Sequence, residues 1–154
     1  MARLSNSPQP SLIDKRGSAS TPPLIHKRGQ GGVVVMVFGV FDGLHPGHQY
    51  FLSQAGEYGN LIVVVARDAN AQQLKHKTPT YNQEKRIAAI REFLPDATVI
   101  LGDKRQGTYE VVKTYRPAMI LLGHDQEKLY EDLQANIDSG NVNFIEFKTL
   151  RELP

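Results

Sequence analysis

Five short apolar runs, rich in β-branched residues, constrain the fold of this chain more than any other feature. They occupy residues 33–38, 61–66, 98–101, 119–122 and 142–147. The first four runs are nearly continuous rather than alternating, a pattern typical of strands that are covered on both faces in a parallel sheet. The sequence therefore predicts about five strands, of which the first four are buried on both faces.

Segments with helical spacing separate these runs, at residues 46–58, 82–94, 108–115 and 126–137. In the clearest of them, 82–94, Ile87, Ile90 and Phe93 form an apolar stripe and Pro95 ends the helix. Strands and helices in alternation predict an α/β fold, a Rossmann-like doubly wound parallel sheet of about five strands. In such sheets a ligand binds beyond the carboxyl ends of the strands, near the point where the strand order reverses.

The first 32 residues differ in composition from the rest of the chain. They are rich in Ser, Pro and Gly, and they carry five Lys/Arg against one acidic residue, whereas the remaining 13 basic and 15 acidic residues give −2. Such a segment cannot bury enough apolar surface to offset its chain entropy. We interpret residues 1–32 as a disordered basic extension, with a docking motif or a transit peptide as alternatives, and residues 33–154 as one folded domain.

Composition excludes several function classes. The chain of 154 residues has no cysteine, so disulfides and thiolate zinc sites are ruled out. No apolar run approaches the roughly 20 residues that span a bilayer, so no membrane partner is expected. Because the excess positive charge belongs to the first 32 residues, a nucleic-acid partner is not indicated either. We expect a cytoplasmic protein that acts on small molecules.

The ten residues Gly39-Val40-Phe41-Asp42-Gly43-Leu44-His45-Pro46-Gly47-His48 follow the first apolar run and lead into a helix. Pro46 suits a first helical turn, and a glycine at position 47 lets backbone and ligand approach closely. Helix N-termini attract phosphate, and two imidazoles three residues apart add donors on one helix face. The pattern therefore favours phosphate chemistry. Structural histidines are the alternative, and a metal site would need ligands that are not nearby in the sequence.

These residues resemble the GTFDxxHxGH signature of the cytidylyltransferase-like nucleotidyltransferases, with Val40 in place of the common threonine. The resemblance covers residues 33–147 and is strongest toward archaeal-type FAD synthases and glycerol-3-phosphate cytidylyltransferase. One lysine, Lys75, and four further segments match the family: Leu61 to Asp68, Tyr81-Asn82-Gln83-Glu84-Lys85-Arg86, Ile100-Leu101-Gly102-Asp103 and Leu122-Gly123-His124-Asp125-Gln126.

The resemblance implies transfer of a nucleoside monophosphate from ATP or CTP to a phosphorylated acceptor, with Mg²⁺ accompanying the nucleotide and pyrophosphate leaving. It assigns catalytic roles to His45, His48 and Lys75. It implies nucleotide or acceptor contacts for Val40, Phe41, Asp42, Gly47, Arg86, Asp103, Gly123 and Asp125. Transfer of AMP to FMN is the first expectation, and a cytidylyltransferase for glycerol 3-phosphate is the alternative. Members often form homodimers, which makes a dimer an option here.

Several of these residues also have purely structural interpretations. Lys75 and Lys77 fall in a stretch typical of a polar loop of solvated charges. Arg86 could pair with Asp68 or Glu84, and Asp103 could cap a turn. Tyr50, Phe51 and Phe93 are expected in the core. The chain also lacks a clear version of the family's Ser/Thr-rich ISSTxxR segment near its end, which keeps a nucleotide-binding module without turnover as a third alternative.

Overall fold

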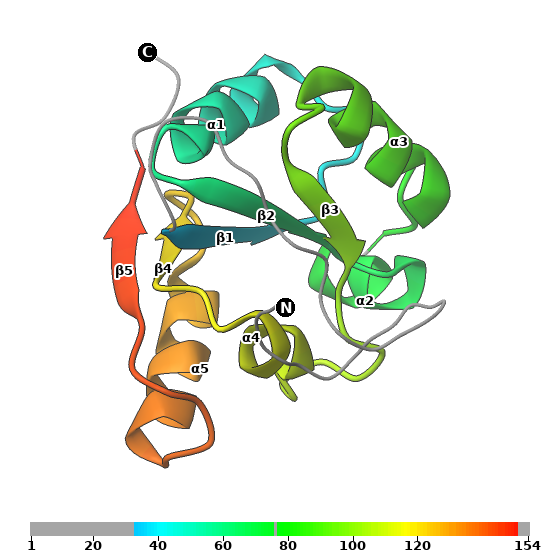
Figure 1. The fold of residues 1–154 in the computed structure, drawn as a ribbon. Coiled ribbons are helices and arrows are strands. Elements are labelled where there is room, and N and C mark those ends of the chain that lie inside the picture. Colours follow the sequence, from blue (N-terminus) through cyan, green and yellow to red (C-terminus); the bar gives the residue numbers. More distant parts are fainter. Residues whose placement is uncertain (1–32, 76, 151–154) are drawn as a thin grey trace, which may run out of the picture.

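The computed structural model describes residues 33–75 and 77–150, which form a five-stranded, all-parallel sheet with helices on both faces (Figure 1). The strands are β1 (Val34–Gly39), β2 (Asn60–Val65), β3 (Thr98–Leu101), β4 (Met119–Leu122) and β5 (Glu146–Thr149). Their order in the sheet is β3-β2-β1-β4-β5. The predicted α/β class, parallel sheet and strand number are thereby confirmed. The prediction for residues 1–32 lies outside the described residues.

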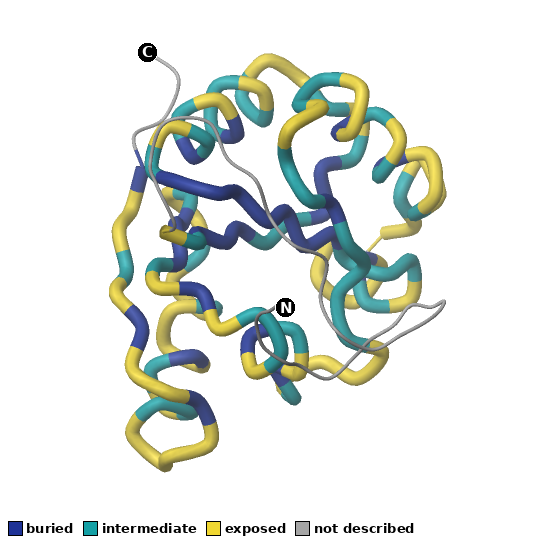
Figure 2. The backbone as a smooth tube through the Cα atoms, viewed as in Figure 1, coloured by how far each residue is buried: buried dark blue, intermediate teal, exposed yellow. Residues whose placement is uncertain are grey.

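Alternation along the strands divides the core into two layers, because successive side chains of a strand point to opposite faces. The helices are α1 (Pro46–Gly56), α2 (Asp68–Lys75), α3 (Gln83–Phe93), α4 (Glu110–Tyr115) and α5 (Glu127–Asp138). On one face Val35 and Val37 pack with residues of α1 and α3, and on the other Met36 packs with residues of α4 and α5. Figure 2 shows β1 and β2 as the mostly buried centre of the molecule, and the edge strand β5 and the outer helix surfaces as largely exposed.

Fully buried leucines connect the helices to the two layers. Leu52 of α1 and Leu133 of α5 are both 0 % exposed, and burying such a side chain contributes roughly 2 kcal/mol to folding. The helix α3 begins as the sequence predicts, because the side chain of Asn82 accepts a hydrogen bond from the Lys85 amide at 2.9 Å. The described helices include none that is long and apolar enough to cross a membrane.

Two elements differ from the sequence prediction. The last strand occupies Glu146–Thr149 rather than 142–147, because Val142 and Ile145 are buried in the core layer beside α5 before the edge strand begins. Lys75, predicted to lie in a polar loop, is instead the last residue of α2, whereas Lys77 follows that helix. This helix buries Ala71 as its only described core residue, so it has no apolar stripe by which the sequence could reveal it.

The strand order reverses between β1 and β4, and there the sheet opens toward its carboxyl edge. The two strands pair in register only at Val35 with Met119 and at Met36 with Ile120. Beyond that point β1 continues to Gly39 and β4 to Leu122 without further paired positions. The carboxyl ends therefore separate at the switch point, which is where doubly wound sheets bind their ligands.

Candidate active site

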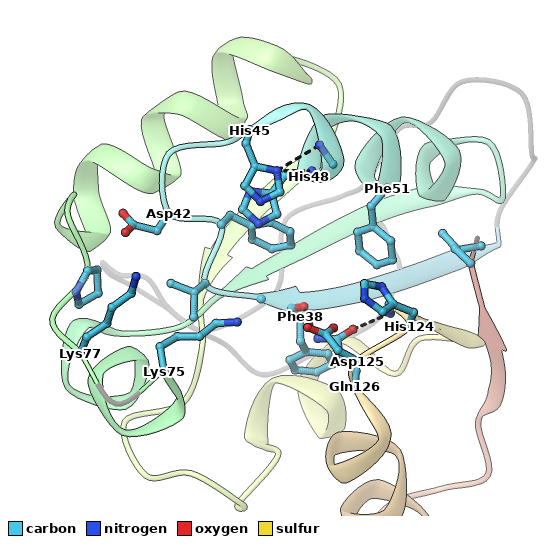
Figure 3. Close-up of a pocket in the computed structure, with 17 residues that line it drawn as sticks. Phe38, Asp42, His45, His48, Phe51, Lys75, Lys77, His124, Asp125 and Gln126 are labelled. Carbon is cyan, nitrogen blue, oxygen red and sulfur yellow. Dashed lines mark hydrogen bonds between the residues drawn. The ribbon is translucent and has the colours of Figure 1, made fainter. Parts of the chain in front are cut away.

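A pocket of about 520 Å³ lies at this switch point (Figure 3). Its lining comes from four parts of the chain: the end of β1 with the turn into α1, the lysines at positions 75 and 77, the turn that follows β4, and Leu150 after β5. A volume of this size is typical of pockets that hold a small organic ligand or cofactor. The pocket is therefore where the chemistry predicted from the sequence would take place.

The turn from β1 to α1 has an unusual backbone. Phe41 and Leu44 have φ angles of 56° and 42°, in the left-handed region that non-glycine residues rarely adopt. A Cβ atom at Gly39 would lie 2.7 Å from the Phe41 ring, so only glycine allows that ring to fold back over the strand end. Strained backbone of this kind persists where the surrounding structure over-determines it, commonly at ligand sites.

His45 caps the N-terminus of α1. Its Nδ1 accepts hydrogen bonds from the backbone amides of Gly47, at 3.1 Å, and His48, at 3.3 Å. Since Nδ1 is an acceptor in both bonds, the neutral ring carries its proton on Nε2. A Cβ atom at Gly47 would approach Cε1 of His45 to 2.9 Å, so the glycine makes room for the capping ring. The cap therefore accounts for the glycine between the two histidines.

His48 lies between two other rings. Its imidazole stacks on that of His45, with centroids 3.6 Å apart, and meets the edge of Phe41 at 5.4 Å. Burial, followed by the nearby positive charges of His45 and Lys75, lowers the pKa of His48 to about 4. Nδ1 of His48 is enclosed and has no hydrogen-bond partner among the described residues, which leaves Nε2 as the nitrogen that can meet a ligand. His48 is therefore neutral near pH 7 and can act as a hydrogen-bond donor.

Two lysines give the pocket its positive charge. Lys75 and Lys77 both line it, and Figure 3 shows Lys75 directed toward the space between the histidines and Asp125. The carboxylate of Asp42, next to Lys77 in the same view, accepts backbone hydrogen bonds from Thr80 at 2.8 Å and Tyr81 at 2.9 Å. Burial works against the charged form of Asp42, but these bonds and the charges of Arg86 and Lys77 outweigh it and lower its pKa.

Gln126 spans the gap between the separated strands. Its side-chain amide donates to the carbonyl of Phe38 at the end of β1, at 2.9 Å, and its Oε1 accepts from the amide of Gly123 after β4, at 2.8 Å. The turn between them carries Asp125, which also lines the pocket. This bridge closes the floor of the pocket without a ladder hydrogen bond, and it sets the position of the turn that would face a nucleotide.

The structure brings most of the predicted site residues to one place. His45, His48, Lys75, Val40, Phe41, Asp42, Gly47, Gly123 and Asp125 all line the pocket. Arg86 and Asp103 do not. Asp103 accepts hydrogen bonds from the amides of Glu110, at 2.8 Å, and Val111, at 3.2 Å, and thereby caps α4. This agrees with the interpretation of Asp103 as a capping residue. Arg86 is only 1 % exposed and pairs with Asp68 at 2.7 Å, as the alternative interpretation held.

Other residues in the lining were not assigned to the site from the sequence. Phe51 packs against the core, as expected, and also faces the pocket. Lys77 and Gln126 also line the pocket. From the sequence, Lys77 is interpreted as a solvated charge and Gln126 only as part of a family motif. A signal existed for Gln126, because a polar residue that follows a buried strand in a parallel sheet lies at the ligand-binding edge. No comparable signal existed for Leu150, which lies beyond β5.

A fully parallel sheet that opens at its switch point, with a histidine-capped helix beside it, defines a class of Rossmann-like α/β domains. Within that class the chain belongs to the cytidylyltransferase-like family, whose model matches residues 36–149. The described residues contain no group of three or more His, Cys, Asp or Glu side chains that could hold a metal ion.

Individual relatives support this membership. The chain is 45 % identical over 96 residues to an FAD synthase of Aciduliprofundum boonei, covering 62 % of this chain and 63 % of the relative. It is 41 % identical over 100 residues to an FAD synthase of Methanopyrus kandleri, covering 62 % and 65 %. The match thus spans slightly less than two thirds of the length of either relative. A solved structure, the lipopolysaccharide core biosynthesis protein of Thermoplasma volcanium, is 31 % identical with a TM-score of 0.69, covering 80 % of this chain and 100 % of that one.

Proposed function

We propose that this protein transfers the AMP moiety of ATP to FMN, forming FAD and releasing pyrophosphate. The observation that carries the proposal is the stacked pair of His45 and His48 in a pocket that also holds two lysines. The relatives named FAD synthase support the choice of ATP and FMN among nucleotidyl transfers. A cytidylyl transfer to glycerol 3-phosphate uses the same chemistry and is the competing assignment.

In the proposed reaction a phosphate oxygen of FMN attacks the α-phosphorus of ATP. A new P–O bond forms while the bond from the α-phosphorus to the oxygen bridging it to the β-phosphate breaks, and pyrophosphate departs with that electron pair. The Nε2–H groups of His45 and His48 would donate to phosphate oxygens as negative charge develops on them. Because His48 is neutral near pH 7, its role is that of a donor and not of a proton source.

The two lysines and the N-terminus of α1 would neutralise the triphosphate, since a helix N-terminus and ammonium groups both favour anions. Mg²⁺ would arrive with the nucleotide. Asp125 lies in the turn after β4 and lines the pocket, and its carboxylate would suit a water-mediated contact to that ion. The metal would supply charge neutralisation of the phosphates.

Pyrophosphate release is the direct test. Purified protein would be assayed with ATP or CTP as donor and with FMN or glycerol 3-phosphate as acceptor, in the presence of Mg²⁺. The proposal expects release only with ATP and FMN, together with formation of FAD. Release with CTP and glycerol 3-phosphate would favour the competing transferase, and ATP-dependent stabilisation without any release would favour a binding module.

Two further predictions belong to the same proposal and have their own measurements. Homodimer formation, an option that the family resemblance raises, is tested by light scattering coupled to size-exclusion chromatography. The expected cytoplasmic location is tested by fractionation of the source cells.

A further inference from the structure

One buried arginine contacts both ends of the segment that carries the two pocket lysines. The segment runs from Asp68, the first residue of α2, to Tyr81, just before α3. We call residues 68–81 the lysine segment. Arg86 donates from Nη2 to the carboxylate of Asp68 at 2.7 Å and from Nε to the carbonyl of Tyr81 at 3.0 Å. Both ends of the lysine segment are therefore held by a single side chain.

The same guanidinium is tied to the edge of the sheet. Nη1 of Arg86 donates to the carbonyl of Val40, after β1, and to the carbonyl of Ala66, after β2, each at 2.9 Å. A buried cation costs several kcal/mol of desolvation unless its donors are satisfied. Here the donors are satisfied by acceptors after β1, after β2 and in the lysine segment. Arg86 thus fixes the lysine segment relative to the strand ends that form the pocket.

Asp42 provides a second anchor at the far end of the segment. Its carboxylate accepts the amides of Thr80 and Tyr81, so the backbone of Tyr81 is held at its N–H by Asp42 and at its carbonyl by Arg86. Asp42 lies in the turn that leads to the capping histidine, three residues before His45. The anchor therefore connects the lysine segment to the turn that positions the histidines.

Electrostatics gives a reason for two anchors. Lys75 and Lys77 face the same pocket as His48, whose pKa the charge of Lys75 already lowers. Like charges gathered in one pocket repel each other before an anion binds. The contacts of Arg86 and Asp42 lie at the ends of the lysine segment, where they can oppose that repulsion in the absence of substrate.

We propose that Arg86 and Asp42 are positioning residues that hold Lys75 and Lys77 in place for a polyphosphate. This inference rests on the proposed function in that it assigns the triphosphate as the anion. It also changes the role expected of Arg86 from the sequence, since the guanidinium acts through the lysine segment and not on the nucleotide.

A double-mutant cycle tests the coupling of an anchor to a lysine. Asp42→Asn keeps the shape of the side chain but replaces one acceptor with a donor that faces an amide. We expect Asp42→Asn and Lys77→Ala each to raise the KM for the nucleotide about 10-fold, the size expected when a hydrogen bond to a charged group is lost. The double variant should be little worse than either single variant. Effects that multiply would overturn the proposal.

Limited digestion with trypsin reports the anchoring without any substrate. Cleavage after Lys75 and Lys77, followed by mass spectrometry, should be at least several-fold faster in Arg86→Lys and Asp42→Asn than in the wild type. Arg91→Lys is the matched control, because Arg91 lies on the same helix and donates to the carbonyl of Val99 at 3.1 Å. Unchanged cleavage in both anchor variants would contradict the proposal. If Arg86→Lys does not fold, Asp42→Asn and Asp68→Asn decide the outcome.

Binding of inorganic tripolyphosphate, measured by calorimetry, separates this inference from the proposed reaction. Suppose that no donor and acceptor pair turns over, but that tripolyphosphate binds the wild type and that Asp42→Asn and Lys77→Ala weaken its binding alike. The positioning role is then supported and the proposed reaction is contradicted. If FAD forms while Asp42→Asn leaves both tripolyphosphate affinity and KM unchanged, the positioning role is contradicted and the proposed reaction is supported. Failure of the wild type to bind tripolyphosphate overturns the positioning role.

Discussion

The pocket is built from two regions that are held in opposite ways. In the turn from β1 to α1, the defining hydrogen bonds join His45 to residues two and three positions away. In the lysine segment, the defining bonds join Arg86 to a residue 18 positions away and Asp42 to one 39 positions away. The first region carries its geometry in local sequence, whereas the second obtains it from distant contacts. The difference explains why the turn could be read from local sequence, whereas most of the contacts that hold the lysine segment, apart from the Arg86–Asp68 pair, could not.

The local region should give the largest effect on turnover. We expect His48→Ala to lower kcat by about 10²–10³-fold, the loss typical of one preorganised transition-state donor, with the fold retained. His45→Asn sharpens this test, because asparagine is a good helix cap but has no Nε2–H. It should therefore keep the melting temperature near that of the wild type and still lose activity.

Steady-state kinetics and circular dichroism measure both variants. Global unfolding of His48→Ala would instead indicate that the histidine pair serves the fold, and normal activity of His45→Asn would show that His45 acts only as a cap.

A substitution at Gly47 should break the same region by geometry alone. An added Cβ would lie 2.9 Å from the His45 ring, and a displacement of about 1 Å at a reacting group can cost up to roughly 10²-fold in rate. We expect Gly47→Ala to lower kcat by about 10–10²-fold. Gly56→Ala, at the other end of α1, is the matched control because nothing lies within 4 Å of its added Cβ. Equal kinetics for the two variants would refute the steric account.

Gln126 combines both kinds of contact, one local and one distant, and we expect an intermediate effect. Gln126→Ala removes the bridge between Phe38 and Gly123. Loss of these hydrogen bonds should lower the free energy of unfolding by about 1–2 kcal/mol. Chemical denaturation with urea measures this change, with Gln134→Ala on α5, where the side chain donates to Asp138 four positions away, as the control. An unchanged midpoint would show that the separated strands need no bridge.

The last prediction concerns stability at acid pH. The pKa of His48 is about 4 in the folded protein against an ordinary value of 6.5. The unfolded chain therefore binds a proton first as the pH falls, so stability is lost between about pH 6.5 and pH 4. His48→Gln should reduce the drop in melting temperature between pH 7 and pH 4.5. An identical drop in the variant would mean that other groups account for the acid sensitivity.

Much of the fold could be predicted because it depends on patterns that repeat at short range. The bounds of β3 and β4 agree with the predicted runs, since each is a short run of mainly apolar residues. The bounds of β5 do not agree, because buried side chains such as Ile145 belong to the connection that precedes an exposed edge strand. An apolar run indicates that its residues are buried, but buried residues also occur outside strands, so such a run does not by itself set the bounds of a strand.

The site divides in the same way. The sequence by itself determined the turn, the capping histidine and the glycine at position 47, because cap and ring contacts form within three residues. It did not determine the burial of Arg86, since a charged residue on a helix is ordinarily exposed. Three of the four groups that its guanidinium contacts come from 18 to 46 positions away. Only the tertiary structure could decide that the lysine segment is anchored over the pocket, because the groups that satisfy a buried charge become neighbours only when the sheet is assembled.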